Sequence, residues 1–485
     1  MRLKFKQLLN LSGPIMAVIW SFLQRAGTLI IGFVVNIVLA RLLCPEDFGI
    51  VGFIAVFVGL ADVLVDSGLG SALIQTKEVK DADIRTVFTS NLLISLTLFL
   101  GIFIAAPYIA DYVGVPKLDL YLRVESVMVL IRAFYVVQSA LLNRSLKFRD
   151  LAGINIAASV LSAIISISIA LLGGGVWSLI AKNVVLHLSL CVFYRIKSKV
   201  PYKLGINRDS FKQLFGFGIF VAFTNFLDLL YSNVVSFILG KKYSVEDLGY
   251  YNQAHSLKQI PVYSMSMVIT QVLFPYMSRM QDEKERFYEN ARKVINLTSF
   301  MVFPLMAFLV IAAKPIIVLL YSAKWAPSAI YFQILCVAGS MDAFIHINRN
   351  ILKSLGHTKL IFILQCIITV IGVGLLIFSL RFGVTVFVWS VVIFTFIDWA
   401  LGTTCAGIKS GYSIFKQIKD MISSVMISVL LGLAVYYLFS FFQLPVIITC
   451  LLEAVLFFGL YLLIHWLLRT VSMRYFKETI HSSIK

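Results

Sequence analysis

The chain has 485 residues, of which 60% are hydrophobic, and its mean hydropathy is +0.91. So few polar residues cannot cover a water-soluble globule, which excludes a soluble enzyme or binding domain. Lys and Arg number 42 against 24 Asp and Glu, and this net charge of +18 fits the basic cytoplasmic loops of a membrane protein better than a nucleic-acid surface. We therefore expect an all-α polytopic membrane protein that binds no nucleic acid.

Apolar windows long enough to cross a bilayer predict about 14 transmembrane helices. Their centres lie near residues 27, 58, 96, 130, 162, 185, 227, 263, 303, 340, 369, 395, 430 and 456. The first apolar segment is too long for the core of a signal peptide and shows no cleavage site, so we interpret it as a retained helix.

The chain contains an internal repeat. The motif Pro45 to Gly49 returns 200 positions later as Val245 to Gly249, and two further similarities follow in the same order. Six spans in each repeat are an even number, which predicts parallel pseudo-symmetric copies in two lobes, with a transport path between them. The predicted divisions are an N-terminal lobe (1–195), a basic cytoplasmic linker (196–212), a C-terminal lobe (213–408), and two last helices with a cytoplasmic tail (409–485).

Most basic residues fall in loops on one side of the predicted spans. The largest clusters are Arg195 to Lys212 and Arg279 to Lys293. The positive-inside rule then predicts that both termini are cytoplasmic. These clusters could also contact anionic lipid, although topology alone explains them.

No catalytic, metal or cofactor motif is present in the sequence. The six cysteines are scattered without metal-ligand spacing, and no HExxH, Walker or GxSxG pattern occurs. The outer loops are short, which argues against an external catalytic domain. We expect a protein that is not an enzyme and that holds no metal or cofactor.

Four segments together resemble the polysaccharide-transporter branch of the MOP flippase superfamily, which includes the O-antigen and colanic-acid exporters. They are Leu39 to Gly49, Asp66 to Gln75, Phe274 to Gln281, and Pro304 to Trp325. The resemblance implies fourteen helices in two bundles in the bacterial inner membrane. It also implies a flippase that moves oligosaccharide on polyprenyl diphosphate to the outer leaflet, for lipopolysaccharide or exopolysaccharide. Membrane lipids and a polysaccharide polymerase are further partners to expect.

Two other functions remain open at this point. A drug or cation antiporter of the related multidrug branch would share the fold, but the Pro45 to Gly49 and Asp66 to Gln75 motifs argue against it. A membrane glycan polymerase or acyltransferase would need catalytic residues on a substantial exposed loop, which the short outer loops do not offer.

The first predicted span carries a polar stripe at helical spacing. Ser21, Arg25, Thr28, Gly32 and Asn36 fall on one face. The stripe recurs about 200 positions later as Asn225, Asp228, Ser232 and Ser236. A shared cavity face explains the recurrence, and close helix packing through small residues is the alternative.

Charged residues inside the spans are the candidate site. Arg25 needs a partner or water at its depth, and Asp62 and Asp66 lie at similar depths on the next span, so we predict an Arg25–Asp62 pair. This could be a permanent ion pair. Alternatively, Arg25 exchanges Asp62 for a substrate phosphate, which suits the fork of a guanidinium.

The fourth span places Glu125 and Arg132 on one face at heptad spacing, with Arg123 nearer its outer end. Arg132 lies near mid-membrane and is the second candidate for the diphosphate. The full predicted substrate-binding set is Arg25, Asn36, Arg123, Arg132 and Lys258. In the sixth span Lys182 can extend outward to the interface, and His187 has no assigned role.

The second half of the chain is more acidic within its spans. We predict that a coupling proton or sodium ion binds there, at Asp228, Asp342 and His255 or His346. The complete predicted set for ion pairing and coupling is Asp62, Asp66, Asp228, Asp342, His255 and His346. The polar span from Tyr250 to Tyr276 should line a cavity, or else be partly interfacial.

Glu46, Asp47 and Gly49 lie in a short outer turn, although they are diagnostic of the family. Their predicted role is to cap the helix that follows rather than to bind a ligand.

Overall fold

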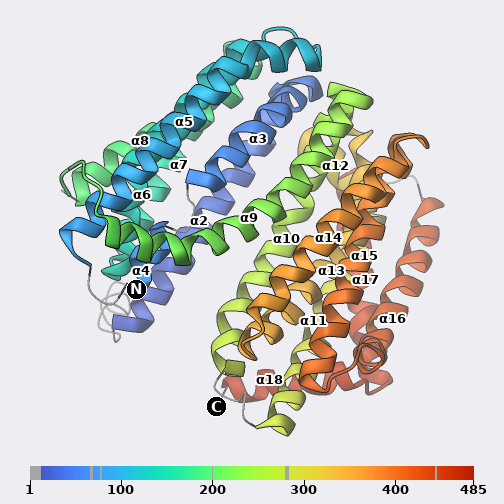
Figure 1. Cartoon of the computed structure of the whole chain (residues 1–485). Helices are drawn as coiled ribbons and strands as arrows, with labels where there is room; N and C mark the ends of the chain where they lie inside the picture. Colours follow the sequence, from blue (N-terminus) through green and yellow to red (C-terminus); the bar gives the residue numbers. More distant parts are fainter. Residues whose placement is uncertain are drawn as a thin grey trace, which may run out of the picture. The chain divides into compact units, whose positions relative to one another are not determined.

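The structure is a computed structural model that describes residues 13–65, 69–76, 79–198, 200–278, 283–442 and 445–484. Within these ranges the regular elements are all helices (Figure 1). Eleven of them are long and apolar enough to cross a membrane. The chain is therefore an all-helical multi-pass membrane protein, as predicted.

The eleven helices coincide with eleven of the predicted spans. The other three predictions fall on α6 (Leu118–Arg144), α9 (Arg208–Lys242) and α10 (Val245–Ser278), which are helical but are not among the eleven. The number fourteen therefore stays a prediction.

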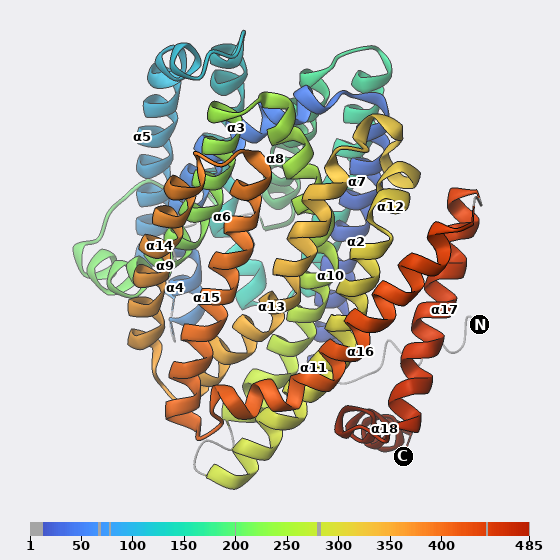
Figure 2. The ribbon, with the colours of Figure 1, turned by 90° about the vertical axis from the view of Figure 1, so that its right-hand side faces the viewer.

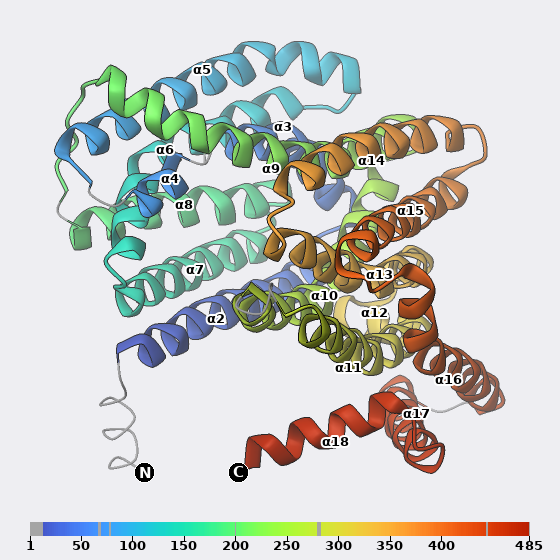
Figure 3. The ribbon, with the colours of Figure 1, turned by 60° about the horizontal axis from the view of Figure 1, so that its bottom comes forward.

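The chain divides into two compact units, one ending at Gly249 and one beginning at Tyr250. Besides α6, α9 and the first residues of α10, unit 1 contains α2 (Gly13–Leu42), α3 (Pro45–Val65), α4 (Leu69–Gln75), α5 (Asp81–Val113), α7 (Phe148–Leu171) and α8 (Val176–Ser198). Within it α5 packs against α6, α7 against α8, and α2 against α7 (Figure 3).

The helix α9, predicted as the first span of the second repeat, packs against α3, α4 and α5 of unit 1. The contacts therefore place α9 in unit 1, whereas the predicted lobes of the repeat are separated by the linker 196–212, which puts α9 in the second lobe. The division into these two lobes stays a prediction.

Unit 2 contains the rest of α10 and the remaining helices. These are α11 (Lys284–Ile311), α12 (Ala313–Tyr321), the 3-10 turn η1 (Ala323–Trp325), α13 (Ser328–Ser354), α14 (Thr358–Ser379), α15 (Val384–Ser410), α16 (Ile414–Ser440), α17 (Val446–Leu467) and α18 (Val471–Ile484). The helix α13 lies beside α11 and α15, and α11 packs against α16 (Figure 2).

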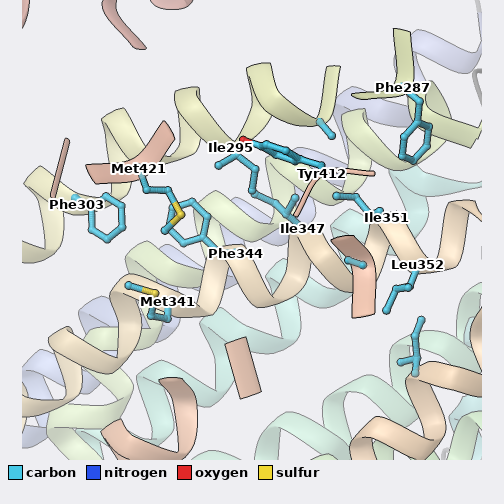
Figure 4. Close-up of a cluster of buried hydrophobic side chains, with 13 residues drawn as sticks. Phe287, Ile295, Phe303, Met341, Phe344, Ile347, Ile351, Leu352, Tyr412 and Met421 are labelled. Carbon is cyan, nitrogen blue, oxygen red and sulfur yellow. The ribbon is translucent and has the colours of Figure 1, made fainter. Parts of the chain in front are cut away.

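The core of unit 2 lies around α13 and α11 (Figure 4). The rings of Phe303 and Phe344 stack there with centroids 5.4 Å apart. Within this core Tyr412 donates a hydrogen bond to Asp420 at 2.7 Å, and Arg292 binds the same carboxylate with two nitrogens. The Tyr412 hydroxyl and the Asp420 carboxylate are thus paired, as burial requires.

The repeated motif begins α3 and α10, and its acidic residues cap both helices. The Cys44 N–H donates to Asp47 Oδ2 at 3.1 Å. The Ser244 hydroxyl donates to Asp247 Oδ2 at 2.7 Å and accepts from the Asp247 N–H at 2.9 Å. The predicted capping role is confirmed for Asp47, and Asp247 acts in the same way at the start of α10.

The two glycines of the motif have a further role, which is a reciprocal crossing inside unit 1. A β-carbon at Gly49 would overlap the carbonyl oxygen of Val245, and a β-carbon at Gly249 would overlap the carbonyl oxygen of Pro45. The starts of α3 and α10 therefore pack backbone against backbone, which only glycine permits at these positions.

Candidate functional site

The main candidate site is centred on an ion pair between α6 and α3. Arg132 Nη1 lies 3.1 Å from Asp62 Oδ2, and the two side chains are 22% and 24% exposed. These helices pack against each other in unit 1. A guanidinium with so little exposure to solvent needs an anionic partner, and Asp62 supplies it.

Two hydrogen bonds join the same face of α6 to α8. Asn183 Nδ2 donates to Glu125 Oε1 at 3.0 Å, and the Tyr135 hydroxyl lies 2.8 Å from His187 Nδ1. Asn183 and His187 are four residues apart, so both face α6. The heptad face of α6 is thus the one that carries the polar contacts.

A cavity of about 190 Å³ opens beside these groups. Its lining is Val51, Ile54, Ala55, Val58, Gly59, Asp62, Glu125, Met128, Asn183 and His187. Glu125 is 1% exposed, and its Oε2 atom accepts no hydrogen bond from the part of the chain that the structure describes. We call Asp62, Glu125, Arg132, Asn183 and His187 the Arg132 site.

A second ion pair lies in unit 2, between α10 and α13. Lys258 Nζ lies 2.8 Å from Asp342 Oδ2, with side-chain exposures of 6% and 21%. The stem of Lys258 passes Gly339, where a β-carbon would come within 2.9 Å of Lys258 Cδ. His255 is one turn before Lys258, its Nε2 lies 3.3 Å from Gln259 Nε2, and its ring stacks on Tyr251. Lys258, Asp342 and His255 are therefore brought together, as neighbours in one unit.

The two ion pairs join equivalent helices of the predicted repeats with the charges exchanged. In unit 1 the acid is on the second helix and the cation on the fourth, whereas in unit 2 Lys258 is on the second and Asp342 on the fourth. The cation is partly exposed in the first pair and buried in the second. Both charges of the unit 1 pair are thus partly exposed, whereas in unit 2 the carboxylate alone is.

The predicted pairing of Arg25 with Asp62 is wrong. The Arg25 side chain is exposed on α2, and Asp62 pairs with Arg132. The physical reason is the packing order, because α2 packs against α7 whereas α3 packs against α6. Similar depth in the membrane did not make Arg25 and Asp62 neighbours.

The structure describes three further predicted site residues, each on a different helix. Asn36 is half-buried on α2, and the Arg123 guanidinium lies over the Phe103 ring at 5.1 Å. His346 is exposed on α13. Asp66 and the side chain of Asp228 lie outside the described residues.

Sequence reasoning missed several partners of the charged residues. Asp398 on α15 pairs with Arg349 on α13 at 3.0 Å, and neither residue was singled out. Asn183 and Tyr135 were not singled out, although a spacing of four to His187 was a readable signal for Asn183. In the described ranges no group of three or more His, Cys, Asp or Glu residues could hold a metal ion.

Comparison with known proteins gives one matching family model, described as polysaccharide biosynthesis protein, over residues 38–330. The chain is 30% identical to the succinoglycan biosynthesis transport protein ExoT of Rhizobium meliloti, over 63% of this chain and 62% of that protein. It is 23% identical to the lipopolysaccharide biosynthesis protein WzxC of Escherichia coli, over 66% of this chain and 65% of that protein. Both alignments span less than two thirds of the relative's length.

Two solved structures resemble the chain over most of its length. The lipid II flippase MurJ in an inward closed conformation has a TM-score of 0.72 at 18% identity, covering 94% of this chain and 99% of that one. An inward-facing multidrug resistance transporter of the MATE family, in the MOP superfamily, has a TM-score of 0.59 at 18% identity, covering 81% and 98%. At these identities the likeness shows a shared fold.

Proposed function

This chain belongs to the polysaccharide biosynthesis protein family, whose model matches more than half of its length, and from that premise we propose that it is a flippase for oligosaccharide units on polyprenyl diphosphate. The predicted resemblance to the polysaccharide-transporter branch of the MOP flippase superfamily is confirmed by that match. In this proposal the chain moves its cargo from the cytoplasmic to the outer leaflet of a bacterial inner membrane, without catalysing a reaction. The names of its relatives, a succinoglycan transport protein and a lipopolysaccharide biosynthesis protein, support a cargo of this class.

The observation that carries the proposal is the Arg132–Asp62 pair beside the cavity. A diphosphate cannot cross hydrocarbon unless fixed cations replace its water, and a guanidinium offers two parallel donors to phosphate oxygens. The Arg132 side chain is 22% exposed, so an anion can reach the guanidinium and compete with Asp62 while the ion pair is still formed. Arg132 therefore exchanges Asp62 for the substrate diphosphate.

The exchange leaves Asp62 without its partner whenever substrate is bound. A lone carboxylate in a membrane span is costly, so a proton or a sodium ion should take the place of Arg132. Glu125, held by Asn183 beside the same cavity, offers a second carboxylate to that ion. In unit 2, Asp342 and His255 are a second candidate place for the coupling ion, with Lys258 as the internal partner of Asp342.

The remaining parts of the proposal concern topology. Fourteen spans, with both termini cytoplasmic, would let two parallel lobes alternate access to the cargo. The basic residues of the loops support this orientation through the positive-inside rule. A polysaccharide polymerase that takes up the delivered units is the partner expected at the outer face.

Deletion of the gene in its host tests this function. Mass spectrometry of isolated inner membranes would measure polyprenyl-diphosphate oligosaccharides, and an impermeant glycan-modifying reagent would report their sidedness. The proposal predicts that complete units accumulate facing the cytoplasm and that the wild-type gene clears them. Unchanged amounts and sidedness, in a strain without a second flippase, would favour a drug or cation antiporter instead. Flux that is insensitive to pH, sodium and membrane potential would contradict the coupling.

A further inference from the structure

The connection between α8 and α9, residues 200–207, is fixed to unit 1 rather than being a loose linker (Figure 3). We call these residues the linker strap. The Gly205 N–H donates to Thr89 Oγ1 at 2.9 Å, and the Asn207 N–H donates to Thr86 Oγ1 at 2.9 Å. Both hydroxyls belong to one turn near the start of α5, so the backbone of the strap is held along that helix.

An aromatic anchor holds the other end of the strap. The Tyr202 ring stacks on Phe88 with centroids 5.2 Å apart and meets Phe134 edge-on at 5.7 Å. The Arg195 guanidinium covers the same ring at 4.6 Å from its centroid. Tyr202 thus packs against the cluster of buried residues between α5 and α6.

The outward side of the strap is apolar. Leu204 is 67% exposed and Ile206 is 57% exposed, and Ile196 at the end of α8 is 66% exposed. A backbone pinned on one side cannot turn these side chains inward. Two large exposed aliphatic groups on a short, fixed segment, with a third at the end of the preceding helix, form a surface that favours an apolar environment.

Cations without carboxylate partners surround these aliphatic groups. Lys203 and Arg208 are exposed, and the stem of Arg85 lies 3.8 Å from the β-position of Gly205. In the part of the chain that the structure describes, none of these three forms an ion pair, whereas Lys197 pairs with Asp150 at 3.1 Å. Asp209 is the acidic neighbour of Arg208, so the surface remains net positive.

The strap lies where a bilayer surface is expected. The helix α8 is one of the candidate membrane spans, and the strap begins directly after it, whichever side of the membrane that end faces. Aliphatic side chains that alternate with Lys and Arg suit the boundary between acyl chains and headgroups. There the aliphatic side chains enter the apolar layer, and the charged groups stay at the phosphates.

We propose that the linker strap is a docking surface for anionic phospholipid headgroups. Lys203, Arg208 and Arg85 bind the headgroup phosphates, and Leu204 and Ile206 enter the upper acyl layer. The attraction comes from charge complementarity, because an anionic leaflet binds basic segments at its surface whereas a zwitterionic leaflet does not. This goes beyond the proposed transport function and does not depend on the cargo.

Tryptophan quenching by brominated lipid tests the proposal on the full-length protein. Leu204→Trp would be reconstituted in bilayers that contain either brominated phosphatidylglycerol or brominated phosphatidylcholine. The unaltered protein has six tryptophans, and its signal would be subtracted. We expect both lipids to quench the introduced indole, with phosphatidylglycerol selected over phosphatidylcholine at low salt.

Charge removal then identifies the groups responsible. Lys203→Gln and Arg208→Gln, each made in the Leu204→Trp background, should weaken the selection on the order of fivefold for each cation lost. Arg381→Gln removes an exposed cation elsewhere and should leave it unchanged. Salt titration of the Leu204→Trp protein needs no further variant, so misfolding of a second variant cannot affect its result. High salt should abolish the selection of phosphatidylglycerol over phosphatidylcholine. An introduced indole that neither lipid quenches, or equal quenching by the two lipids, would overturn the proposal.

Discussion

Arg132 on α6 and Asp342 on α13 carry opposite charges on the fourth helix of the two predicted repeats, and each pairs with the second helix of its own predicted repeat. Arg132 is 22% exposed, whereas the cation of the other pair, Lys258, is 6% exposed. One unit thus has a partly exposed guanidinium, paired with a partly exposed carboxylate. The other unit kept an internal lysine behind an accessible carboxylate, so the two units suit different ligands.

Replacement of Arg132 should stop transport with a modest loss of stability. Arg132→Gln removes the proposed diphosphate ligand and leaves Asp62 partly exposed, so we expect a cost of about 1–2 kcal/mol in unfolding free energy. Thermal unfolding in detergent measures the stability, and complementation of the deletion strain measures transport. Arg132→Lys keeps the charge but loses the fork, and should retain partial activity.

The double variant Asp62→Arg with Arg132→Asp separates pairing from substrate binding. It restores an ion pair between α3 and α6, so stability should recover relative to either single change. Transport should not recover, because the cation now lies on α3. Full transport by the exchanged pair would contradict the role of Arg132 as a positioned phosphate ligand.

Loss of the carboxylate should reduce the unfolding free energy more at the Lys258–Asp342 pair than at the Arg132–Asp62 pair. Asp342→Asn leaves the buried Lys258 cation without its counter-charge, at a cost of about 3–5 kcal/mol, compared with about 1–2 kcal/mol for Asp62→Asn. Thermal unfolding of the two variants under one condition provides the comparison. Adding Lys258→Met to Asp342→Asn removes the buried charge and should restore most of the stability; equal losses for the two single variants would contradict the difference in burial.

The close crossing at Gly49 and Gly249 predicts that adding a single methyl group at either position destabilises the protein. Gly49→Ala or Gly249→Ala places a β-carbon against a carbonyl oxygen that belongs to the opposing helix start, and the helices must separate, at a cost of about 1–3 kcal/mol or more. Gly101→Ala in α5 is the matched control, since its β-carbon would meet nothing within 4 Å. Unfolding temperatures of the three variants test this. A loss for Gly101→Ala as large as that for Gly49→Ala would refute the crossing.

Cys44, in the turn before α3, should be an unreactive thiol at neutral pH. Cys44 is an exposed residue, but partial burial of its thiol, followed by the hydrogen bond to Asp47 and the charge of that carboxylate, raises the pKa of Cys44 to about 11. Because the thiolate is the reactive form, maleimide labelling should rise about tenfold per pH unit up to that value. Asp47→Asn removes the charge that raises the pKa of Cys44, so labelling at about pH 8 should be faster than in the unaltered protein. If the labelling rate of the unaltered protein levelled off at about pH 9, the pKa of Cys44 would be that of an ordinary thiol.

The sequence predicted the helical architecture well, because each span carries its own apolar signal. The heptad spacing of Glu125 and Arg132 also identified the face of α6 that meets α8. These are local properties, which periodicity along one helix can define.

The sequence could not predict which helices are neighbours. Depth along the spans pointed to Arg25 as the partner of Asp62, and the packing of α3 on α6 gives it Arg132 instead. The crossing of Gly49 with Gly249 is likewise a contact between residues 200 positions apart. The repeat showed that the two motifs are related, but not that they touch.

The most direct test is the sidedness of a polyprenyl-diphosphate oligosaccharide in proteoliposomes that contain the purified protein. An impermeant glycan-modifying reagent would report which fraction lies in the outer leaflet over time. The account predicts that the wild-type protein makes nearly all of the lipid accessible, whereas Arg132→Gln, folded to a similar extent, leaves the inner-leaflet fraction protected. Equal rates for the two proteins would contradict the central claim that Arg132 carries the diphosphate across.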